Sequence, residues 1–235
     1  MEFPRATVYV VDDDPGVRRA LERLLDSAGY RATTFGSAAE FLAGHDPNSS
    51  GCLILDLALP GCGGLDLQSV LNASEGGLPI IFLSGCGSIP VSVQAMKAGA
   101  VTFLTKPVRE WELVAAVREA LSLDARWRRT RALRARTQTR IASLTPRERE
   151  VLDHIIDGNL NKQIAAKLGT VEQTVKVHRA RVMKKMGARS VAELVRFATM
   201  SSAEDASAGE ASESDAEPHG MQSRGRPGRS PVQLD

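Results

Sequence analysis

The sequence predicts an α/β domain followed by a smaller all-α domain. Two patterns indicate the first domain: short apolar runs alternate with segments of helical periodicity, and several of these runs end in a carboxylate, a hydroxyl or a lysine. Unbroken apolar runs bounded by turn residues are typical of strands buried on both faces of a parallel sheet. A run of basic helical segments after residue 140 indicates the second domain.

Five strands and five helices are expected in the first domain. The expected strands are residues 7–11, 31–35, 52–55, 79–83 and 101–104. The expected helices are residues 15–28, 37–43, 65–73, 90–98 and a last helix from Arg109. One face of the first helix is apolar at helical spacing and carries Val17, Ala20, Leu21, Leu24, Leu25 and Ala28. This alternation predicts a flavodoxin-like (βα)5 fold with strand order 2-1-3-4-5.

Side chains suited to phosphoryl chemistry follow four of these strands, namely Asp12, Asp13, Asp56, Ser84 and Lys106. Because the first and third strands are neighbours in this order, the three carboxylates are expected in one crevice. Crowded carboxylates repel unless a hard cation lies among them, and oxygen ligands suit Mg²⁺. We therefore predict a magnesium-dependent site at which Asp56 is the nucleophile that accepts a phosphoryl group. Ser84 would donate a hydrogen bond and Lys106 would supply positive charge.

Residues 6–121 resemble the receiver domain of response regulators. The matching segments are the acidic pair at 12–13, DLALPGCGG from Asp56, IIFLSGCGSIP with Ser84, and VTFLTKP with Lys106. The resemblance implies that a sensor histidine kinase transfers a phosphoryl group to Asp56.

The resemblance also implies how the metal is held. Asp13 and Asp56 would bind Mg²⁺ through their side chains, Ala58 through its backbone carbonyl, and Asp12 mostly through water. A magnesium phosphatase with an Asp nucleophile is a rival interpretation. Such enzymes need a second Asp two residues after the nucleophile, where this sequence has Ala58.

The residues expected to sense the phosphoryl group, again by resemblance, are Ser84 and Lys106. Phe103 would change rotamer together with Ser84, and a plain core aromatic is the alternative role for Phe103. A cis peptide bond between Lys106 and Pro107 is implied as well, and the energetics of X-Pro bonds permit it.

Charge is distributed unevenly along the chain. Residues 1–121 hold 9 Lys+Arg against 14 Asp+Glu, residues 122–200 hold 18 against 7, and residues 201–235 hold 3 against 7. The basic middle predicts a polyanionic partner. No apolar run approaches the roughly 18 residues of a membrane span, and three cysteines, an odd number, argue against a disulfide framework. We expect a cytoplasmic protein that has no membrane contact.

Four segments are expected: domains at residues 1–121 and 141–200, a basic helical linker at 122–140, and a disordered tail at 201–235. The linker is rich in Arg, Ala and Leu and lacks Pro and Gly, which favours a helix. A solvated spacer and non-specific contact with the DNA backbone are both open roles for it. The tail holds almost no large apolar residues.

Residues 141–200 predict an all-α domain that contains a helix-turn-helix. Thr145 and Glu148 form a capping box at the start of its first helix. A short second helix, a turn at Gly169 and a basic third helix over residues 171–186 form the helix-turn-helix.

The third helix has a core face and an outer face. The core face carries Val175, His178, Val182 and Met186, and His178 is expected to pack there. The outer face, expected to enter a major groove, carries Gln173, Lys176, Val177, Ala180 and Lys184, flanked by Arg179 and Arg181. Lys176 is the best candidate for a base contact, and Val177 and Ala180 suit thymine methyl groups.

Residues 141–199 resemble the four-helix output domain of NarL/FixJ (LuxR-type) regulators, most closely the FixJ/TodT/StyR-like branch. The matching text is LTPREREVL, NKQIA, TVKVHRARVMKKMGARS and AELV. The resemblance implies Lys176, Val177 and Ala180 as groove residues, with Gln173, Thr174, Arg179, Arg181 and Lys184 nearby. It also implies that a homodimer binds two promoter half-sites, and RNA polymerase is a candidate partner.

The sequence thus predicts a transcription regulator of a two-component system rather than an enzyme. Phosphorylation of Asp56 is expected to promote dimerisation and promoter binding. The alternative is a constitutive DNA-binding regulator whose receiver is a phosphorylation-independent interaction module. The complete set of acidic, hydroxyl and lysine residues favours the phosphorylation switch.

Overall fold

The structure, a computed structural model, describes residues 6–74, 77–85 and 89–199. The chain divides into two compact units between Leu133 and Arg134, which we call the N-terminal and C-terminal units. The predicted tail at 201–235 lies outside the described residues, so its disorder stays a prediction. Among the described residues, no helix is long and apolar enough to cross a membrane.

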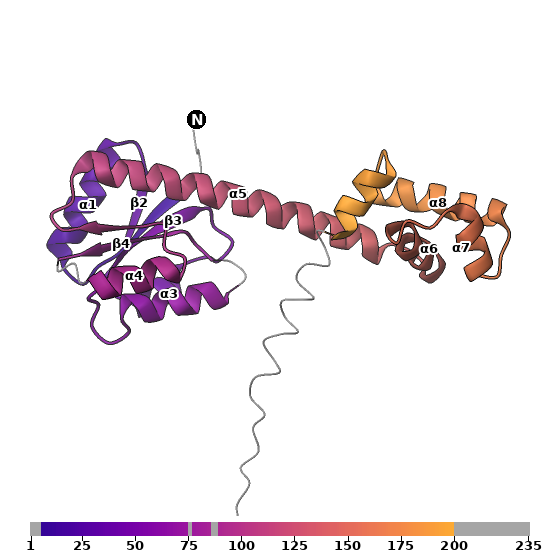
Figure 1. Cartoon of the computed structure of the whole chain (residues 1–235). Helices are drawn as coiled ribbons and strands as arrows, with labels where there is room; N and C mark the ends of the chain where they lie inside the picture. The colour runs from indigo at the N-terminus through magenta and orange to yellow at the C-terminus, as the bar shows by residue number, and fades with distance from the viewer. Residues whose placement is uncertain (1–5, 75–76, 86–88, 200–235) are drawn as a thin grey trace, which may run out of the picture. The chain divides into compact units, whose positions relative to one another are not determined.

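The N-terminal unit is a parallel five-stranded sheet with helices on both faces (Figure 1). Its strands are β1 Thr7–Val11, β2 Arg31–Phe35, β3 Gly51–Asp56, β4 Ile80–Ser84 and β5 Thr102–Thr105. Its helices are α1 Pro15–Ser27, α2 Ala38–Gly44, α3 Gly64–Ala73, α4 Ile89–Lys97 and α5 Glu110–Ala142, of which the residues from Arg134 onward belong to the C-terminal unit. The strand order is β2-β1-β3-β4-β5, which confirms the predicted flavodoxin-like fold.

Alternate residues of the central strands enter two separate cores. In β1, Val8 and Val10 pack with residues of α1 and α5, whereas Tyr9 and Val11 pack with residues of α2, α3 and α4. Burial on both faces explains why these strands are unbroken apolar runs in the sequence. Ala20, predicted on the buried face of α1, is exposed, because it lies about 100° around the helix from Leu21.

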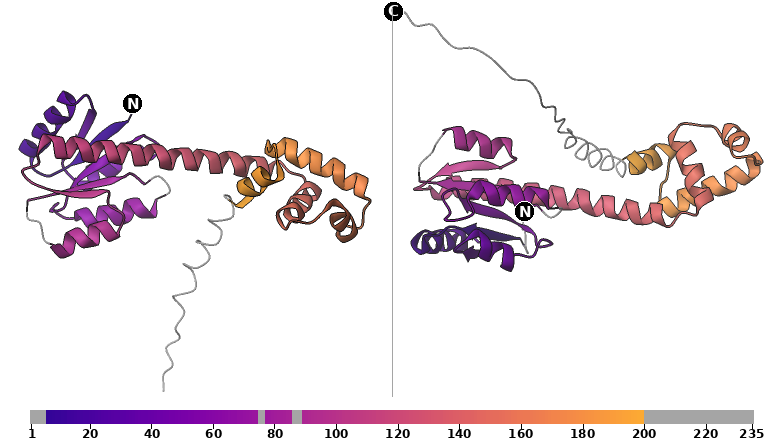
Figure 2. Two further views of the ribbon diagram at one scale, coloured as in Figure 1. Left: turned by 45° about the horizontal axis from the view of Figure 1, so that its top comes forward. Right: turned by 90° about the horizontal axis from the view of Figure 1, so that it is seen from below.

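The helix α5 continues without a break through the segment predicted as a helical linker (Figure 2). A buried carboxylate ties the start of that segment to the N-terminal unit. Asp124 is 1% exposed, and its Oδ2 accepts hydrogen bonds from Ser50 Oγ at 2.7 Å and from the Gly51 N–H at 3.2 Å. Arg128 donates through Nε to both Asp124 oxygens at 3.1 Å and through its other nitrogens to two carbonyls of the loop before β3.

The C-terminal unit is all-α and contains the predicted helix-turn-helix. After the end of α5, its described helices are α6 Pro146–Ile156, α7 Asn161–Lys167, α8 Glu172–Met186 and a last helix over residues 191–199. The capping box is present, because Thr145 Oγ1 accepts from the Glu148 N–H and Glu148 Oε2 accepts from the Thr145 N–H. The turn between α7 and α8 places Gly169 at φ 62°, a conformation that favours glycine.

We expect Asp124→Ala to destabilise the N-terminal unit by about 3 kcal/mol, because a buried acceptor is lost while its donors remain. Trp111 and Trp127 are the two tryptophans of the chain and both belong to this unit, so fluorescence in urea reports its unfolding. The matched control is Glu119→Ala, an exposed carboxylate on the same helix, expected to change stability by less than about 0.5 kcal/mol. Equal unfolding midpoints for the two variants would contradict this role of Asp124.

Candidate functional site

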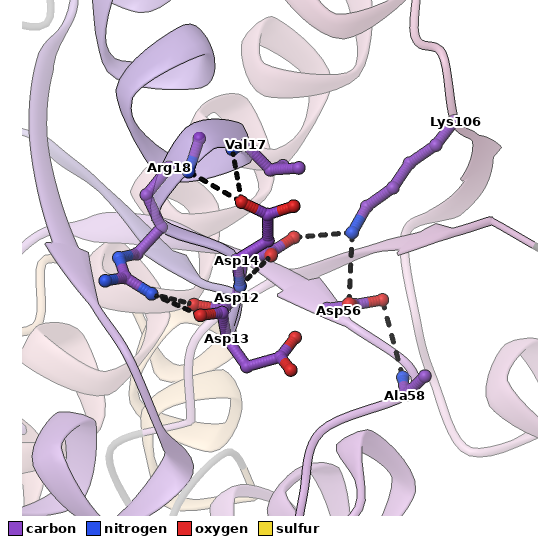
Figure 3. A network of polar contacts seen from close by, with 9 residues as sticks. Asp12, Asp13, Asp14, Val17, Arg18, Asp56, Ala58 and Lys106 are labelled. Atoms are coloured by element: carbon purple, nitrogen blue, oxygen red, sulfur yellow. Dashed lines mark hydrogen bonds and ion pairs between the residues drawn. The ribbon is translucent and has the colours of Figure 1, made fainter.

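The ends of β1 and β3 bring acidic side chains together at one edge of the sheet, next to Lys106 (Figure 3). Asp12 and Asp13 follow β1, Asp56 ends β3, Ser84 ends β4 and Lys106 follows β5. Ligand oxygens of the three aspartates lie within 4.8 Å of one another. Asp12 and Asp56 are buried, at 1% and 6% exposure, whereas Asp13 is exposed. We call this group of three carboxylates the acidic site.

Lys106 bridges two of the three carboxylates. Its Nζ lies 2.6 Å from Asp12 Oδ2 and 3.0 Å from Asp56 Oδ2 (Figure 3). Partial burial by itself lowers the pKa of Lys106, but the hydrogen bonds to Asp12 and Asp56 outweigh it and raise the pKa above its ordinary value. The lysine is therefore charged and offsets part of the repulsion between the aspartates. The cis peptide bond implied between Lys106 and Pro107 is present.

The loop that carries Asp12 and Asp13 is fixed by its own hydrogen bonds. Arg18 on α1 donates to the carbonyl oxygens of Asp12 at 2.6 Å and Asp13 at 3.0 Å. Asp12 Oδ1 accepts from the Asp14 N–H, and Asp14 in turn caps the N-terminus of α1. The sequence analysis missed Arg18, because no spacing rule links a helix arginine to carbonyls of the loop before it.

The donor set fits a hard divalent cation. Three carboxylates converge from two neighbouring strands, and carboxylate oxygens are ligands that Mg²⁺ prefers. Ala58 is exposed, and its N–H donates to Asp56 Oδ1 at 3.4 Å. The predicted role of its carbonyl as a metal ligand stays a prediction.

The two predicted switch residues lie on the neighbouring strands. Ser84 is 4% exposed and pairs in register with Thr105 of β5. Phe103 is half-buried: it packs against the core on the α3 and α4 side and also lines a shallow groove of about 630 Å³ with Val93 and Met96. A ring that lies between a core and a groove is compatible both with a rotamer change coupled to Ser84 and with a plain core aromatic.

The outer face of α8 is a candidate nucleic-acid interface. Val175, Val182 and Met186 are fully buried, and His178 is half-buried with its Nδ1 shielded from solvent, so the core face lies where it was predicted. The predicted outer residues that are exposed are Gln173, Lys176, Val177, Ala180, Arg181 and Lys184.

Two of the predicted DNA contacts have partners within the protein, and a third is partly covered. Arg179 is half-buried and donates to Asn161 Oδ1 of α7 at 3.3 Å. Lys176 Nζ lies 3.3 Å from Glu172, and both side chains are exposed, so this ion pair is weak. A phosphate or a base edge could therefore replace Glu172 as the partner of Lys176 at little cost in free energy. Thr174, the third residue, is half-buried.

A charged contact between helices holds α8 in place. Lys185 of α8 donates to Glu148 Oε2 of α6 at 2.6 Å and to the Ser143 carbonyl at 3.0 Å. Glu148 is 3% exposed, and the hydrogen bond from Lys185, aided by that from the Thr145 N–H, lowers the pKa of Glu148 to about 2. The sequence analysis identified the capping role of Glu148 but missed Lys185, which is 37 residues away.

Comparisons with known proteins match both units. The family model described as response regulator receiver domain matches residues 8–118, and that described as bacterial regulatory proteins, luxR family, matches residues 142–198. Nodulation protein W of Bradyrhizobium diazoefficiens is 46% identical over 82% of this chain and 85% of that protein. The transcriptional regulatory protein FixJ of Azorhizobium caulinodans is 44% identical over 82% of this chain and 92% of that protein. The solved structure of the response regulator StyR has a TM-score of 0.74 and 46% identity, covering 83% of this chain and 98% of StyR.

The low pKa of Glu148 predicts acid sensitivity of the C-terminal unit. A carboxyl with a folded pKa of about 2 and an ordinary pKa of 4.5 stabilises the folded state fully above pH 4.5, and this stabilisation is lost as the pH falls toward 2. We expect the difference in thermal midpoint between the wild type and Glu148→Gln to be constant at neutral pH and to shrink below pH 4.5. Far-UV circular dichroism follows both units, and tryptophan fluorescence separates out the N-terminal unit.

The control for this measurement is Glu150→Gln, an exposed glutamate on the same helix that pairs with Arg147 at 2.7 Å. Its difference from the wild type should be small and nearly independent of pH. The same pH dependence for both variants would argue against the Glu148–Lys185 contact.

Proposed function

We propose, because this chain belongs to the family of two-component response regulators with a LuxR-type DNA-binding domain, that phosphorylation of Asp56 switches its binding to promoters. Members of this family are DNA-binding transcription regulators that act with a sensor histidine kinase, and they are not enzymes. One observation carries the proposal: three carboxylates and Lys106 converge at one sheet edge in a chain that also has an exposed basic helix. A cytoplasmic location follows from DNA as the partner.

The acidic site supports Asp56 as the phosphoryl acceptor. A carboxylate oxygen of Asp56 would form a bond to phosphorus while the bond from phosphorus to the kinase histidine breaks. Asp13 and Asp56 would hold Mg²⁺ directly, Asp12 mostly through water, and Ala58 through its carbonyl. Bound Mg²⁺ would supply positive charge for the phosphoryl oxygens. Lys106 lies 3.0 Å from Asp56 and adds a second positive charge at the same place.

The switch would act through the strands next to Asp56. A phosphoryl group adds charge, so Ser84 and Lys106 would move toward it and Phe103 would follow. Exposed apolar side chains lie around that region on α4 and α5, namely Val93, Met96 and Trp111. A second copy of the chain would cover them in a homodimer, and a few kcal/mol of differential stability are enough to shift the population.

DNA recognition is assigned to the outer face of α8. Lys176, Val177 and Ala180 would contact base edges in the major groove, and Arg179, Arg181 and Lys184 would contact phosphates, with Gln173 and Thr174 beside them. A dimer presents two such helices, which suits two promoter half-sites. RNA polymerase is a candidate partner of the DNA-bound dimer.

The alternative function is constitutive DNA binding with a receiver that only binds a partner. Lys106 Nζ lies within 3.0 Å of both Asp12 and Asp56, and its charge offsets part of theirs, so the carboxylates of the acidic site have a partner other than a metal or a phosphoryl group. Phosphorylation and DNA binding must therefore be measured together to separate the two functions.

We expect Mg²⁺ to stabilise the N-terminal unit. At a free concentration ten times its dissociation constant, a ligand that binds only the folded state adds about 1.4 kcal/mol. Asp13→Asn removes an exposed ligand of the acidic site and should abolish this gain, whereas Asp66→Asn, an exposed carboxylate that caps α3, should retain it. Urea unfolding followed by tryptophan fluorescence, with and without Mg²⁺, measures the effect. Equal gains in the wild type and Asp13→Asn would rule out this metal site.

We expect acetyl phosphate with Mg²⁺ to label the wild type and not Asp56→Asn. The labelled wild type should elute as a dimer and bind a DNA duplex selected by the protein from a random library more tightly than the unlabelled protein. Asp46→Asn, an exposed aspartate in the loop before β3, serves as the control and should be labelled normally. Labelling without a change in size or in DNA affinity would favour the constitutive alternative.

A further inference from the structure

The end of α5 contacts the end of the recognition helix within the C-terminal unit. Arg140 lies in the last turn of α5, and its Nη1 donates to the Met186 carbonyl at 2.8 Å. Met186 is the last residue of α8. Arg140 also lies outside the region that the luxR-family model matches, which begins at residue 142.

Arg140 supplies the Met186 carbonyl with a hydrogen-bond donor that α8 itself cannot provide. The last carbonyls of an α-helix have no donor within the helix. In the turn after α8, the N–H of Gly187 bonds to carbonyls of residues 183 and 184, and the N–H of Ala188 bonds to that of Met183. These bonds use other carbonyls, and the Met186 carbonyl accepts its hydrogen bond from Arg140. A cation at a helix C-terminus also interacts favourably with the helix dipole.

The backbone beside this contact leaves room for the guanidinium. A Cβ placed on Gly187 would lie 3.1 Å from three atoms of the Arg140 guanidinium, and Gly187 has φ 64°. Arg140 is half-buried, whereas Arg136, about one turn earlier on the same helix, is exposed. The arginine therefore packs over a glycine that ends the recognition helix, and it is not a freely solvated linker charge.

We propose that Arg140 is a positioning residue for DNA binding: it fixes the C-terminal end of α8 and so sets the angle at which the outer face of α8 meets the groove. The inference rests on the proposed function only in that α8 is the helix that contacts DNA. Arg140 acts through Met186 and makes no DNA contact of its own. The last turn of α5 thereby belongs to the DNA-binding machinery.

The test uses the full-length chain and a duplex that the wild type selects from a random-sequence library, together with a duplex of unselected sequence. Arg140→Ala should weaken binding to the selected duplex by up to about tenfold, because at most the free energy of one charge-assisted hydrogen bond is then needed to bring α8 into position on binding. Because no phosphate contact is lost, the slope of log affinity against log salt should stay unchanged. Binding to the unselected duplex should weaken less, so the ratio of the two affinities falls.

Three variants serve as controls. Arg181→Ala, an exposed arginine of α8, should reduce the salt slope by about 0.9 if it contacts one phosphate. Arg136→Ala removes the same charge from an exposed position of α5 and should leave the affinity ratio unchanged. Arg140→Lys keeps a charged donor and should recover part of the ratio, which also covers the case in which Arg140→Ala does not fold.

Several outcomes would overturn the inference. A reduced salt slope for Arg140→Ala would show direct phosphate contact, and equal effects of Arg140→Ala and Arg136→Ala would show a general charge effect. An unchanged affinity ratio for Arg140→Ala would show that the contact does not position α8. If the wild type selects no duplex at all, the proposed DNA-binding function fails instead.

Discussion

The main constraint on the N-terminal unit is that its strand order places three mutually repelling carboxylates at one edge of the sheet. One carboxylate oxygen of each lies within 4.8 Å of the others because β1 and β3 are neighbours in the sheet. Lys106 reaches two of them from the end of β5, and Arg18 fixes the loop that carries the third, Asp13. One ammonium does not neutralise three carboxylates, so the site retains an excess of negative charge that favours a divalent cation.

The sequence was sufficient for the fold because the signals were local and redundant. Strands buried on both faces are unbroken apolar runs, and the predicted bounds of β1 to β5 agree with the structure to within one residue. The strand order then placed Asp12, Asp13 and Asp56 at one edge. The side-chain contacts could not be predicted in the same way. Asp124 and Arg128 have helical spacing, but their partners in the loop before β3 are more than 70 residues away, and only the folded chain brings them together.

The same reasoning applies to the predicted linker at 122–140, whose bounds rest on composition alone. Charge and helix propensity change near residue 121, and the predicted linker therefore begins at 122. Asp124 is nevertheless buried, and it belongs to the N-terminal unit, which extends to Leu133. A buried aspartate looks like any other charge in a sequence, since only its paired donors distinguish it from a solvated one. Arg140 is a second charge that the sequence does not distinguish from its neighbours. It is one of seven arginines in residues 122–140, and only the structure shows that it pairs with α8.

Three ion-paired clusters share one asymmetry that bears on how a switch can work. Side-chain exposure is 22% for Lys106 against 1% for Asp12, 30% for Arg128 against 1% for Asp124, and 36% for Lys185 against 4% for Glu148. In each, the carboxylate is fixed in the protein and the cation lies at the boundary with solvent. Moving such a cation costs less than moving its partner, since a long basic side chain keeps access to water. Lys106 is therefore easier to move than the carboxylates of the acidic site. In the proposed switch it would turn toward a phosphoryl group on Asp56, while the carboxylates stay where the sheet holds them.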